Sequence, residues 1–264
     1  MELINFLKID KNQYLEKKVI TNQIKTSKKS IFKLPLNSKN FDGVLDGGFS
    51  INKKYLIFGA NRTGKTQICH QLSIQASIIE KIKKVYYFDT ENTFRPERIE
   101  QMATGQKIDF RNVLKTIKVS KIMSNNALLL KLTELPNNLN ADENTLIIID
   151  SINNFYRLEQ GKKEVSYSKI KKTFIKILDK IEDLLENYNL IIVATGQIYP
   201  NFVETAIIHE LPVGNPYLNH YFSEYLYLSI KTEENFVQLV NSHNLPERKV
   251  LFRISTLGIE DYRI

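Results

Sequence analysis

The segment Gly59-Ala60-Asn61-Arg62-Thr63-Gly64-Lys65-Thr66 fits the pattern G-x-x-x-x-G-K-[ST] at every defined position. An apolar run of strand length, Tyr55–Phe58, precedes it, and a stretch of helix length, Gly64–Lys81, follows it. In this context the glycines let backbone amides face a phosphate, and the N-terminus of the helix adds positive potential. The segment therefore predicts a phosphate-binding loop (P-loop) between a strand and a helix. The alternative is a glycine turn that carries a surface lysine.

Two residues of this loop have distinct expected roles. Lys65 reaches the β- and γ-phosphates of a nucleotide in such loops, and the Thr66 hydroxyl ligates Mg²⁺. The loop thus implies ATP and Mg²⁺ as cofactors. The residues expected to bind the nucleotide here are Gly59, Asn61, Arg62, Thr63, Gly64, Lys65, Thr66 and Gln67.

Beyond the loop, apolar β-branched runs alternate with amphipathic stretches of helix length. The predicted strands are Tyr55–Phe58, Val85–Phe88, Val113–Val119, Leu146–Ile149 and Leu190–Ala194. The further predicted helices are Pro96–Thr104, Asn125–Leu135 and Ser166–Tyr188. Because the strands are almost continuously apolar, we expect a parallel sheet that is covered on both faces.

The last part of the chain has a different pattern. Three runs, Leu226–Ile230, Phe236–Val240 and Val250–Ile254, follow one another through short turns, which is typical of an antiparallel meander. We therefore predict an α/β fold, a doubly wound and mainly parallel sheet with antiparallel strands at its C-terminal end.

Asp150, Glu91 and Gln197 each stand at or just after the end of a predicted strand. Open α/β sheets bind ligands at this edge. We expect Asp150 to hold the metal with Thr66, Glu91 to position and activate the attacking water, and Gln197 to sense the γ-phosphate. Glu91, Gln197 and Lys65 form the expected catalytic set. The alternatives are a capping or turn aspartate, a solvated glutamate and an ordinary loop amide.

Positive charge is concentrated near the N-terminus. The 264 residues include 37 Lys and Arg against 29 Asp and Glu, which gives a net charge of +8. Residues 1–40 contain nine lysines, no arginine and three acidic residues, a net charge of +6, so the rest contributes only +2. We therefore divide the chain into a lysine-rich N-terminal extension, residues 1–40, and a nucleotide-binding core, residues 41–264.

Composition excludes several classes of protein. Hydrophobic residues make up 42% and charged residues 25% of the chain, which is ordinary for a globular protein. No apolar run reaches the ~18 residues of a membrane-spanning helix, and the N-terminus has no apolar signal core. The single cysteine, Cys69, can form neither an internal disulfide nor a cysteine-rich metal site. We expect a cytoplasmic protein without a membrane partner, associated with the nucleoid if the source is a prokaryote.

Several blocks occur in the order typical of one ATPase family. Besides the P-loop, they are Asp89-Thr90-Glu91-Asn92-Thr93-Phe94-Arg95-Pro96-Glu97-Arg98, Ile149-Asp150-Ser151, Pro212-Val213-Gly214 with His220, Leu245-Pro246-Glu247 and Gly258-Ile259-Glu260-Asp261. On these blocks, residues 41–264 resemble the ATPase core of the RecA/RadA recombinase family, in its archaeal and eukaryotic branch. The resemblance implies a RecA-like P-loop ATPase core and DNA-dependent ATP hydrolysis in homologous recombination and DNA repair.

The resemblance also implies roles for single residues. Glu91 matches the catalytic glutamate, Arg98 the arginine that packs on the adenine, and Gln197 the glutamine that links ATP to the second DNA loop. Pro246 matches the proline that covers the nucleotide from a neighbouring protomer, and His220 a sensor of the γ-phosphate across that interface. The implied partner is a second copy of the chain or a related recombinase. The alternatives are a turn proline and a loop histidine.

The chain departs from the family pattern in two regions. Residues 1–40 do not match the helical N-terminal domain of full-length members, and the docking motif Phe-x-x-Ala is missing, so we interpret the chain as a core-only paralogue. The two DNA loops are expected at Leu158–Ser166 and Ile198–Asn215. The first contains Lys162 and Lys163, which with the N-terminal lysines are candidate contacts to single-stranded DNA. The second has no Lys or Arg.

Three functions fit this pattern. The preferred one is an accessory ATPase that modulates a recombinase or its filaments, because the family's N-terminal domain is missing and the second loop is not basic. The first alternative is a nucleotide-dependent interaction module that does not bind DNA and uses the apolar Ala206-Ile207-Ile208 as a protein contact. The other is a full strand-exchange recombinase.

Overall fold

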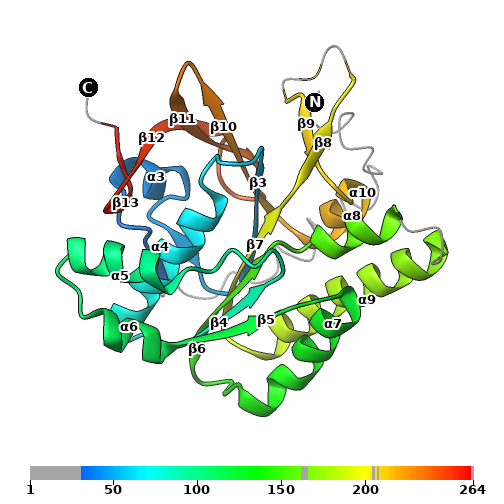
Figure 1. Cartoon of the computed structure of the whole chain (residues 1–264), viewed down its shortest axis with the longest axis horizontal. Coiled ribbons are helices and arrows are strands. Elements are labelled where there is room, and N and C mark those ends of the chain that lie inside the picture. Colours follow the sequence, from blue (N-terminus) through cyan, green and yellow to red (C-terminus); the bar gives the residue numbers. More distant parts are fainter. Residues whose placement is uncertain (1–30, 162–165, 204–205, 207, 263–264) are drawn as a thin grey trace. The chain divides into compact units, whose positions relative to one another are not determined.

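The computed structural model describes residues 31–161, 166–203, 206 and 208–262. The described residues from Lys33 onward belong to one compact unit, Lys33–Ile264. Within the described residues, nine strands form the central sheet (Figure 1). Their spatial order is β13 (Gly258–Asp261), β12 (Arg248–Ser255), β11 (Glu234–Asn241), β10 (Glu224–Lys231), β3 (Lys53–Gly59), β7 (Leu190–Gly196), β6 (Asn144–Asp150), β4 (Ile82–Asp89) and β5 (Ile117–Lys121).

The direction of these strands agrees with the predicted fold. From β10 to β5 each neighbouring pair is parallel, whereas β10, β11, β12 and β13 form an antiparallel meander. The mainly parallel sheet with antiparallel C-terminal strands is therefore confirmed. The carboxyl ends of β3, β4, β6 and β7 lie at one edge of the sheet, which is where such folds bind ligands.

Helices cover both faces of the sheet (Figure 1). One face carries α4 (Lys65–Ile78), α5 (Pro96–Gly105) and α6 (Phe110–Thr116), which contact one another. The other carries α7 (Asn125–Glu134), the 3-10 helix η1 (Leu135–Asn138), α8 (Asn154–Gln160), α9 (Tyr167–Asn187) and α10 (Asn215–Tyr221). On α9, residues at three- and four-residue spacing such as Ile170, Phe174 and Ile177 are buried, and each contributes ~1.5–3 kcal/mol by leaving water.

The prediction of a strand over Val113–Val119 is wrong in its first half. Residues Phe110–Thr116 form α6, and β5 begins only at Ile117. The Asp109 side chain accepts a hydrogen bond from the Arg111 amide at 3.0 Å and so caps this helix. Val113 and Ile117, four residues apart, are both buried, a spacing that suits one face of a helix as well as a strand run.

The segment expected as the second DNA loop contains a small hairpin. Strand β8 (Ile198–Pro200) pairs antiparallel with β9 (Glu210–Pro212). At its neck, the Val213 amide donates to the Gln197 carbonyl at 2.9 Å. The hairpin is therefore continuous with the end of β7, and its two arms are fixed to each other beside the sheet edge.

Residues 33–40 pack with the core, so the compact unit begins at Lys33 and not at residue 41. Strand β1 (Lys33–Leu34) pairs with β2 (Phe49–Ser50), and Leu34 and Leu36 are fully buried. The next helix, α3 (Lys39–Val44), is capped by the C-terminal strand, because Asp261 accepts hydrogen bonds from the Ser38 hydroxyl at 2.7 Å and the Asn40 amide at 2.8 Å.

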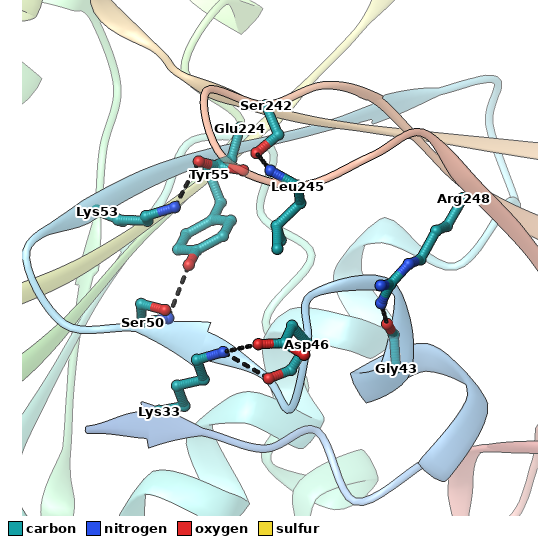
Figure 2. A network of polar contacts seen from close by, with 10 residues as sticks. All are labelled: Lys33, Gly43, Asp46, Ser50, Lys53, Tyr55, Glu224, Ser242, Leu245 and Arg248. Carbon is teal, nitrogen blue, oxygen red and sulfur yellow. Dashed lines mark hydrogen bonds and ion pairs between the residues drawn. The ribbon is translucent and has the colours of Figure 1, made fainter. Parts of the chain in front are cut away.

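Polar contacts tie this N-terminal part to the sheet (Figure 2). The Lys33 ammonium donates to the Asp46 carboxylate at 2.9 Å, and the Arg248 guanidinium of β12 donates to the Gly43 carbonyl at 2.5 Å. At the start of β10 the Glu224 carboxylate, which is fully buried, accepts from Lys53 at 2.7 Å. The Lys33–Asp46 pair is local, whereas the contacts of Arg248 and Glu224 join segments that are far apart in the sequence.

The side chain of His70 is buried on α4. Among the described residues, neither ring nitrogen has a hydrogen-bond partner. The ring lies against Tyr87 and Phe94, with centroid distances of 6.0 and 5.3 Å. Burial lowers the pKa of His70 from its ordinary value of 6.5 to about 4, because the charged imidazolium loses its hydration.

Acid should therefore destabilise the protein through His70. The unfolded chain binds a proton there below about pH 6.5, but the folded chain does so only below about pH 4, so stability falls as the pH drops through this window. The loss in unfolding free energy should be on the order of 3 kcal/mol. Urea unfolding at about pH 7 and about pH 4 measures this difference in unfolding free energy. The difference due to His70 should disappear in His70→Leu and should persist in His243→Leu, a variant at an exposed turn. An unchanged pH dependence in His70→Leu would contradict the assignment.

Candidate nucleotide site

Two glycines shape the P-loop between β3 and α4. Gly59 has a φ of 154°, and a Cβ there would lie 2.2 Å from the Leu228 carbonyl oxygen of β10. Gly64 caps α4 in the left-handed conformation, with a φ of 103°, and a Cβ there would lie 2.9 Å from Ile254 Cδ1. Only glycine fits both positions without displacing a neighbour. The sequence pattern therefore corresponds to a tight loop at the start of a helix, the position at which backbone amides can face a phosphate.

The Lys65 side chain lies over its own loop. Its ammonium donates to the Gly59 carbonyl at 2.7 Å and to the Ala60 carbonyl at 2.8 Å. Burial lowers the pKa of Lys65, and the negative charges of Glu91 and Asp150 oppose that change. A partly dehydrated cation that faces two carboxylates is well placed to bind the phosphates of a nucleotide.

Asp150, at the end of β6, is buried among hydroxyl groups. Its Oδ2 accepts from Thr66 Oγ1 and from the Tyr87 hydroxyl, both at 2.9 Å, and Thr195 donates to its other oxygen. Thr66 and Asp150, the expected metal ligands, are therefore in direct contact. Their oxygens suit Mg²⁺, which prefers hard oxygen donors and commonly uses one or two protein ligands together with phosphates. Within the described ranges, no cluster of three or more His, Cys, Asp or Glu forms another metal site.

The turn after β4 places Glu91 beside Gln197. The buried Asp89 carboxylate accepts from the backbone amides of Thr93 at 3.0 Å and Phe94 at 3.1 Å, which closes the turn. Glu91 Oε1 then accepts from the Ser151 hydroxyl at 2.5 Å and from Gln197 Nε2 at 2.8 Å. Two residues of the expected catalytic set thus meet at the same sheet edge as the P-loop.

Arg98 lies next to the first turn of α4. Its Nε donates to Gln67 Oε1 at 2.7 Å, and its terminal nitrogens donate to the carbonyls of Ser255 at 2.6 Å and Thr256 at 3.1 Å. The guanidinium therefore joins α5, α4 and the turn before β13. This places Arg98 beside a predicted nucleotide-binding residue, Gln67, and leaves its packing on an adenine a prediction.

His220 and Pro246 are exposed on the surface of the protomer. His220 lies on α10, and Pro246 lies in the turn between β11 and β12. This turn is ordered by Ser242, whose hydroxyl accepts from the Leu245 amide at 3.1 Å, and is followed by Arg248, which is bonded to Gly43 (Figure 2). Within the described part of the chain, no hydrogen bond joins either residue to the P-loop. Both remain predicted contacts with a nucleotide on a neighbouring protomer.

Several predicted DNA contacts fall outside the described residues, namely Lys162, Lys163 and the N-terminal lysines before residue 31. In the described part, the beginning of α9 carries exposed lysines beside a hollow of about 350 Å³. The residues that line it are Ser166, Ser168, Lys169, Lys172, Thr173 and Lys176. We call this surface the α9 lysine face. No helix among the described residues is both long and apolar enough to cross a membrane.

Comparison with known proteins identifies the family. The family model described as Rad51 matches residues 27–262. The chain belongs to the Rad51 family. Among curated relatives, the DNA repair and recombination protein RadA of Methanococcus maripaludis is 30% identical over 253 residues, which cover 89% of this chain and 77% of that protein. The meiotic recombination protein DMC1 of Saccharomyces cerevisiae is 28% identical over 241 residues, with 88% and 72% covered.

Membership in the Rad51 family confirms the resemblance to the archaeal and eukaryotic recombinases and the RecA-like fold. The RadA protein of Aeropyrum pernix gives a similar match, 29% identical over 246 residues, covering 90% of this chain and 76% of that protein. The family-model match over residues 27–262 includes the P-loop, Glu91, Asp150 and Gln197. Membership in this family supports an ATPase at the level of the family, and the ends of β3, β4, β6 and β7 carry the residues that the sequence predicts for its site.

Proposed function

We propose that this Rad51-family chain is a Mg²⁺-dependent ATPase that acts inside the cell in homologous recombination and DNA repair, as an accessory paralogue that binds single-stranded DNA. One observation carries the proposal: the sheet edge brings the P-loop lysine, the Thr66–Asp150 pair and the Glu91–Gln197 pair together. These are the parts that phosphoryl transfer to water requires, a phosphate cradle, a metal site and a group that positions the nucleophile.

In the proposed reaction, Lys65 and the loop amides hold the β- and γ-phosphates. Thr66 and Asp150 hold Mg²⁺, which neutralises charge on the phosphate oxygens when it is bound. Glu91 orients a water molecule and accepts its proton as the water oxygen bonds to the γ-phosphorus. The bond from that phosphorus to the β–γ bridging oxygen breaks, and ADP and phosphate leave. Positioning and electrostatic stabilisation supply most of the rate enhancement in such sites.

The proposed DNA contacts are Lys162, Lys163, the N-terminal lysines and the α9 lysine face. Lys169, Lys172 and Lys176 are exposed and lie along one side of α9, and the hydroxyls of Ser166, Ser168 and Thr173 add neutral donors for phosphate oxygens. Residues 198–215 contribute no Lys or Arg. The proposed assembly is a homo-oligomer or a complex with a related recombinase, in which Pro246 and His220 complete the ATP site of a neighbour.

A second candidate is an interaction module that binds nucleotide but not DNA. The observation that favours it is an apolar surface between β8 and β9, where Phe202 is 88% exposed and Val203 and Tyr199 are also exposed. A protein partner would cover these side chains. Of the Ala206-Ile207-Ile208 segment, Ile207 lies outside the described residues, whereas Ala206 and Ile208 are buried and so cannot themselves provide the contact.

Single-stranded DNA should stimulate ATP turnover and should bind through the α9 lysine face. In the double variant Lys169→Ala/Lys172→Ala, the affinity for a single-stranded oligonucleotide should fall, and the slope of log affinity against log salt should become shallower by about 1.4, because two phosphate contacts are lost. Fluorescence anisotropy at several salt concentrations measures both. Lys131→Ala, which removes a lysine paired with Glu134 at 3.0 Å, is the matched control.

Two outcomes would favour other functions. Turnover that does not respond to DNA, together with an unchanged salt slope, would favour the interaction module. Joint-molecule formation with duplex DNA and growth to filament size in light scattering would favour a strand-exchange recombinase. An accessory paralogue should show DNA-stimulated turnover without either activity.

A further inference from the structure

Two neighbouring asparagines hold Gln197 in place. They are Asn153, which precedes α8, and Asn154, the first residue of α8. Neither residue belongs to the P-loop or to the metal pair. Asn153 is fully buried, and its side chain makes three hydrogen bonds with backbone groups. Its Oδ1 accepts from the Gln197 amide at 2.8 Å, and its Nδ2 donates to the carbonyls of Gln197 at 2.9 Å and Val213 at 3.0 Å. Asn153 therefore fixes the backbone of Gln197 at the neck of the β8–β9 hairpin.

Asn154 holds the side chain of the same glutamine. Asn154 Nδ2 donates to the Thr90 carbonyl at 2.7 Å, and its Oδ1 accepts from Gln197 Nε2 at 3.3 Å. Because a backbone carbonyl can only accept, the nitrogen of Asn154 must face Thr90, and its oxygen must then face Gln197. The amide of Gln197 consequently turns its nitrogen toward both Asn154 Oδ1 and Glu91 Oε1.

Little else restrains this amide. Gln197 Oε1 is buried and has no hydrogen-bond partner among the described residues. The orientation of the Gln197 side chain therefore depends on Glu91 and Asn154. A rotated amide would bring its oxygen toward Glu91 Oε1, where two acceptors would repel each other.

We propose that Asn154 is a positioning residue for ATP hydrolysis: it fixes the Gln197 amide so that its nitrogen donates to Glu91. The chain of contacts runs from Thr90 through Asn154 and Gln197 to the Glu91 carboxylate, and it joins the turn after β4, the start of α8 and the neck of the hairpin. The inference rests on the proposed function, because it assigns Glu91 to the reaction. It adds a residue that touches neither the phosphates nor the metal pair.

Asn154→Ala should lower kcat by about 10- to 100-fold, because Glu91 loses a fixed donor, and should change the KM for ATP less than about twofold, because Lys65 and the loop amides are untouched. Steady-state turnover over a range of ATP concentrations separates the two parameters. Asn137→Ala, at an exposed position of η1, is the matched control and should change neither. Asn154→Leu, which keeps a side chain of similar size, should behave like Asn154→Ala and guards against an effect of the lost volume.

A double-mutant cycle distinguishes positioning from a structural role. If Asn154 acts through Gln197, Asn154→Ala should cause no further loss of kcat in a Gln197→Ala background. Additive losses would overturn the proposal, and so would wild-type kcat in both Asn154 variants. Its failure is separable from that of the proposed function: inactive Glu91→Gln with fully active Asn154→Ala rejects only the positioning role, whereas fully active Glu91→Gln rejects the proposed mechanism.

Discussion

Replacing Glu91 with Gln should abolish most ATP turnover while leaving nucleotide binding intact. The new amide oxygen can still accept from Ser151 and Gln197, so the shape of the site is kept, but an amide cannot take the proton of the attacking water. Loss of a general base costs about 10²- to 10⁴-fold in rate, which corresponds to about 2.7–5.5 kcal/mol in the barrier. Phosphate release under single-turnover conditions, with ATP binding followed separately, measures the two effects.

The control for this change is Glu97→Gln, at an exposed position in the first turn of α5. It removes the same charge from the same region and should leave turnover near the wild-type rate. If Glu91→Gln hydrolyses ATP as fast as the wild type, Glu91 is not the base. If it loses binding as well as turnover, the carboxylate acts on the nucleotide itself and not on the water.

Much of this site was predictable because strands leave a clear signal in the sequence. The apolar runs that end at Phe58, Phe88, Ile149 and Ala194 all became neighbouring strands, and parallel strands place their carboxyl ends at one edge. The P-loop, Asp150, Glu91 and Gln197 follow those ends directly. To predict that these residues converge, it was therefore enough to identify the strands correctly and to expect a parallel sheet. Side-chain packing did not have to be known.

The parts that were not predicted depend on contacts between distant segments. Asn153 and Asn154 look like ordinary polar residues after a strand, and only the return of the chain at Gln197 and Val213 gives them partners. Asp261 caps α3 from the other end of the sequence, and together with the β1–β2 pairing this contact joins residues 33–40 to the core. The first half of the strand predicted at Val113–Val119 was wrong because its apolar spacing suits either element, and the residues up to Thr116 belong to a helix that Asp109 caps.

Two carboxylates of the site, Asp150 and Glu91, are already fixed by hydrogen bonds. Asp150 is enclosed by hydroxyl donors, and Glu91 is held by two donors of its own. Because these donors hold the carboxylates in place, the groups expected to bind the metal and to position the water are oriented before a nucleotide binds, and positioning is a main source of catalysis in phosphoryl transfer. Lys65, in contrast, is bonded to carbonyls of its own loop and must exchange them for phosphate oxygens.

Replacing Lys65 with Ala should therefore remove ATP binding. The ammonium supplies charge-assisted hydrogen bonds to phosphates, which are worth about 1.5–3 kcal/mol each, so losing one or two of them lowers the affinity by ~10- to 10⁴-fold. The carboxylates of Glu91 and Asp150 then face the phosphates without this cation, which adds repulsion. MgATP should also no longer stabilise the folded variant. Saturating MgATP should raise the Tm of the wild type and should leave the Tm of Lys65→Ala unchanged.

Charge, and not side-chain length, should account for this loss. Lys65→Met keeps most of the apolar stem and should lose affinity as severely as Lys65→Ala, whereas Lys115→Ala, on the exposed side of α6, should bind normally. Because burial opposes the charged form of Lys65, its removal should cost the nucleotide-free protein little, and the Tm without ATP should stay close to that of the wild type. Normal ATP affinity in Lys65→Met would show that the ammonium does not hold the phosphates, and the role of the P-loop would then rest on its backbone amides alone.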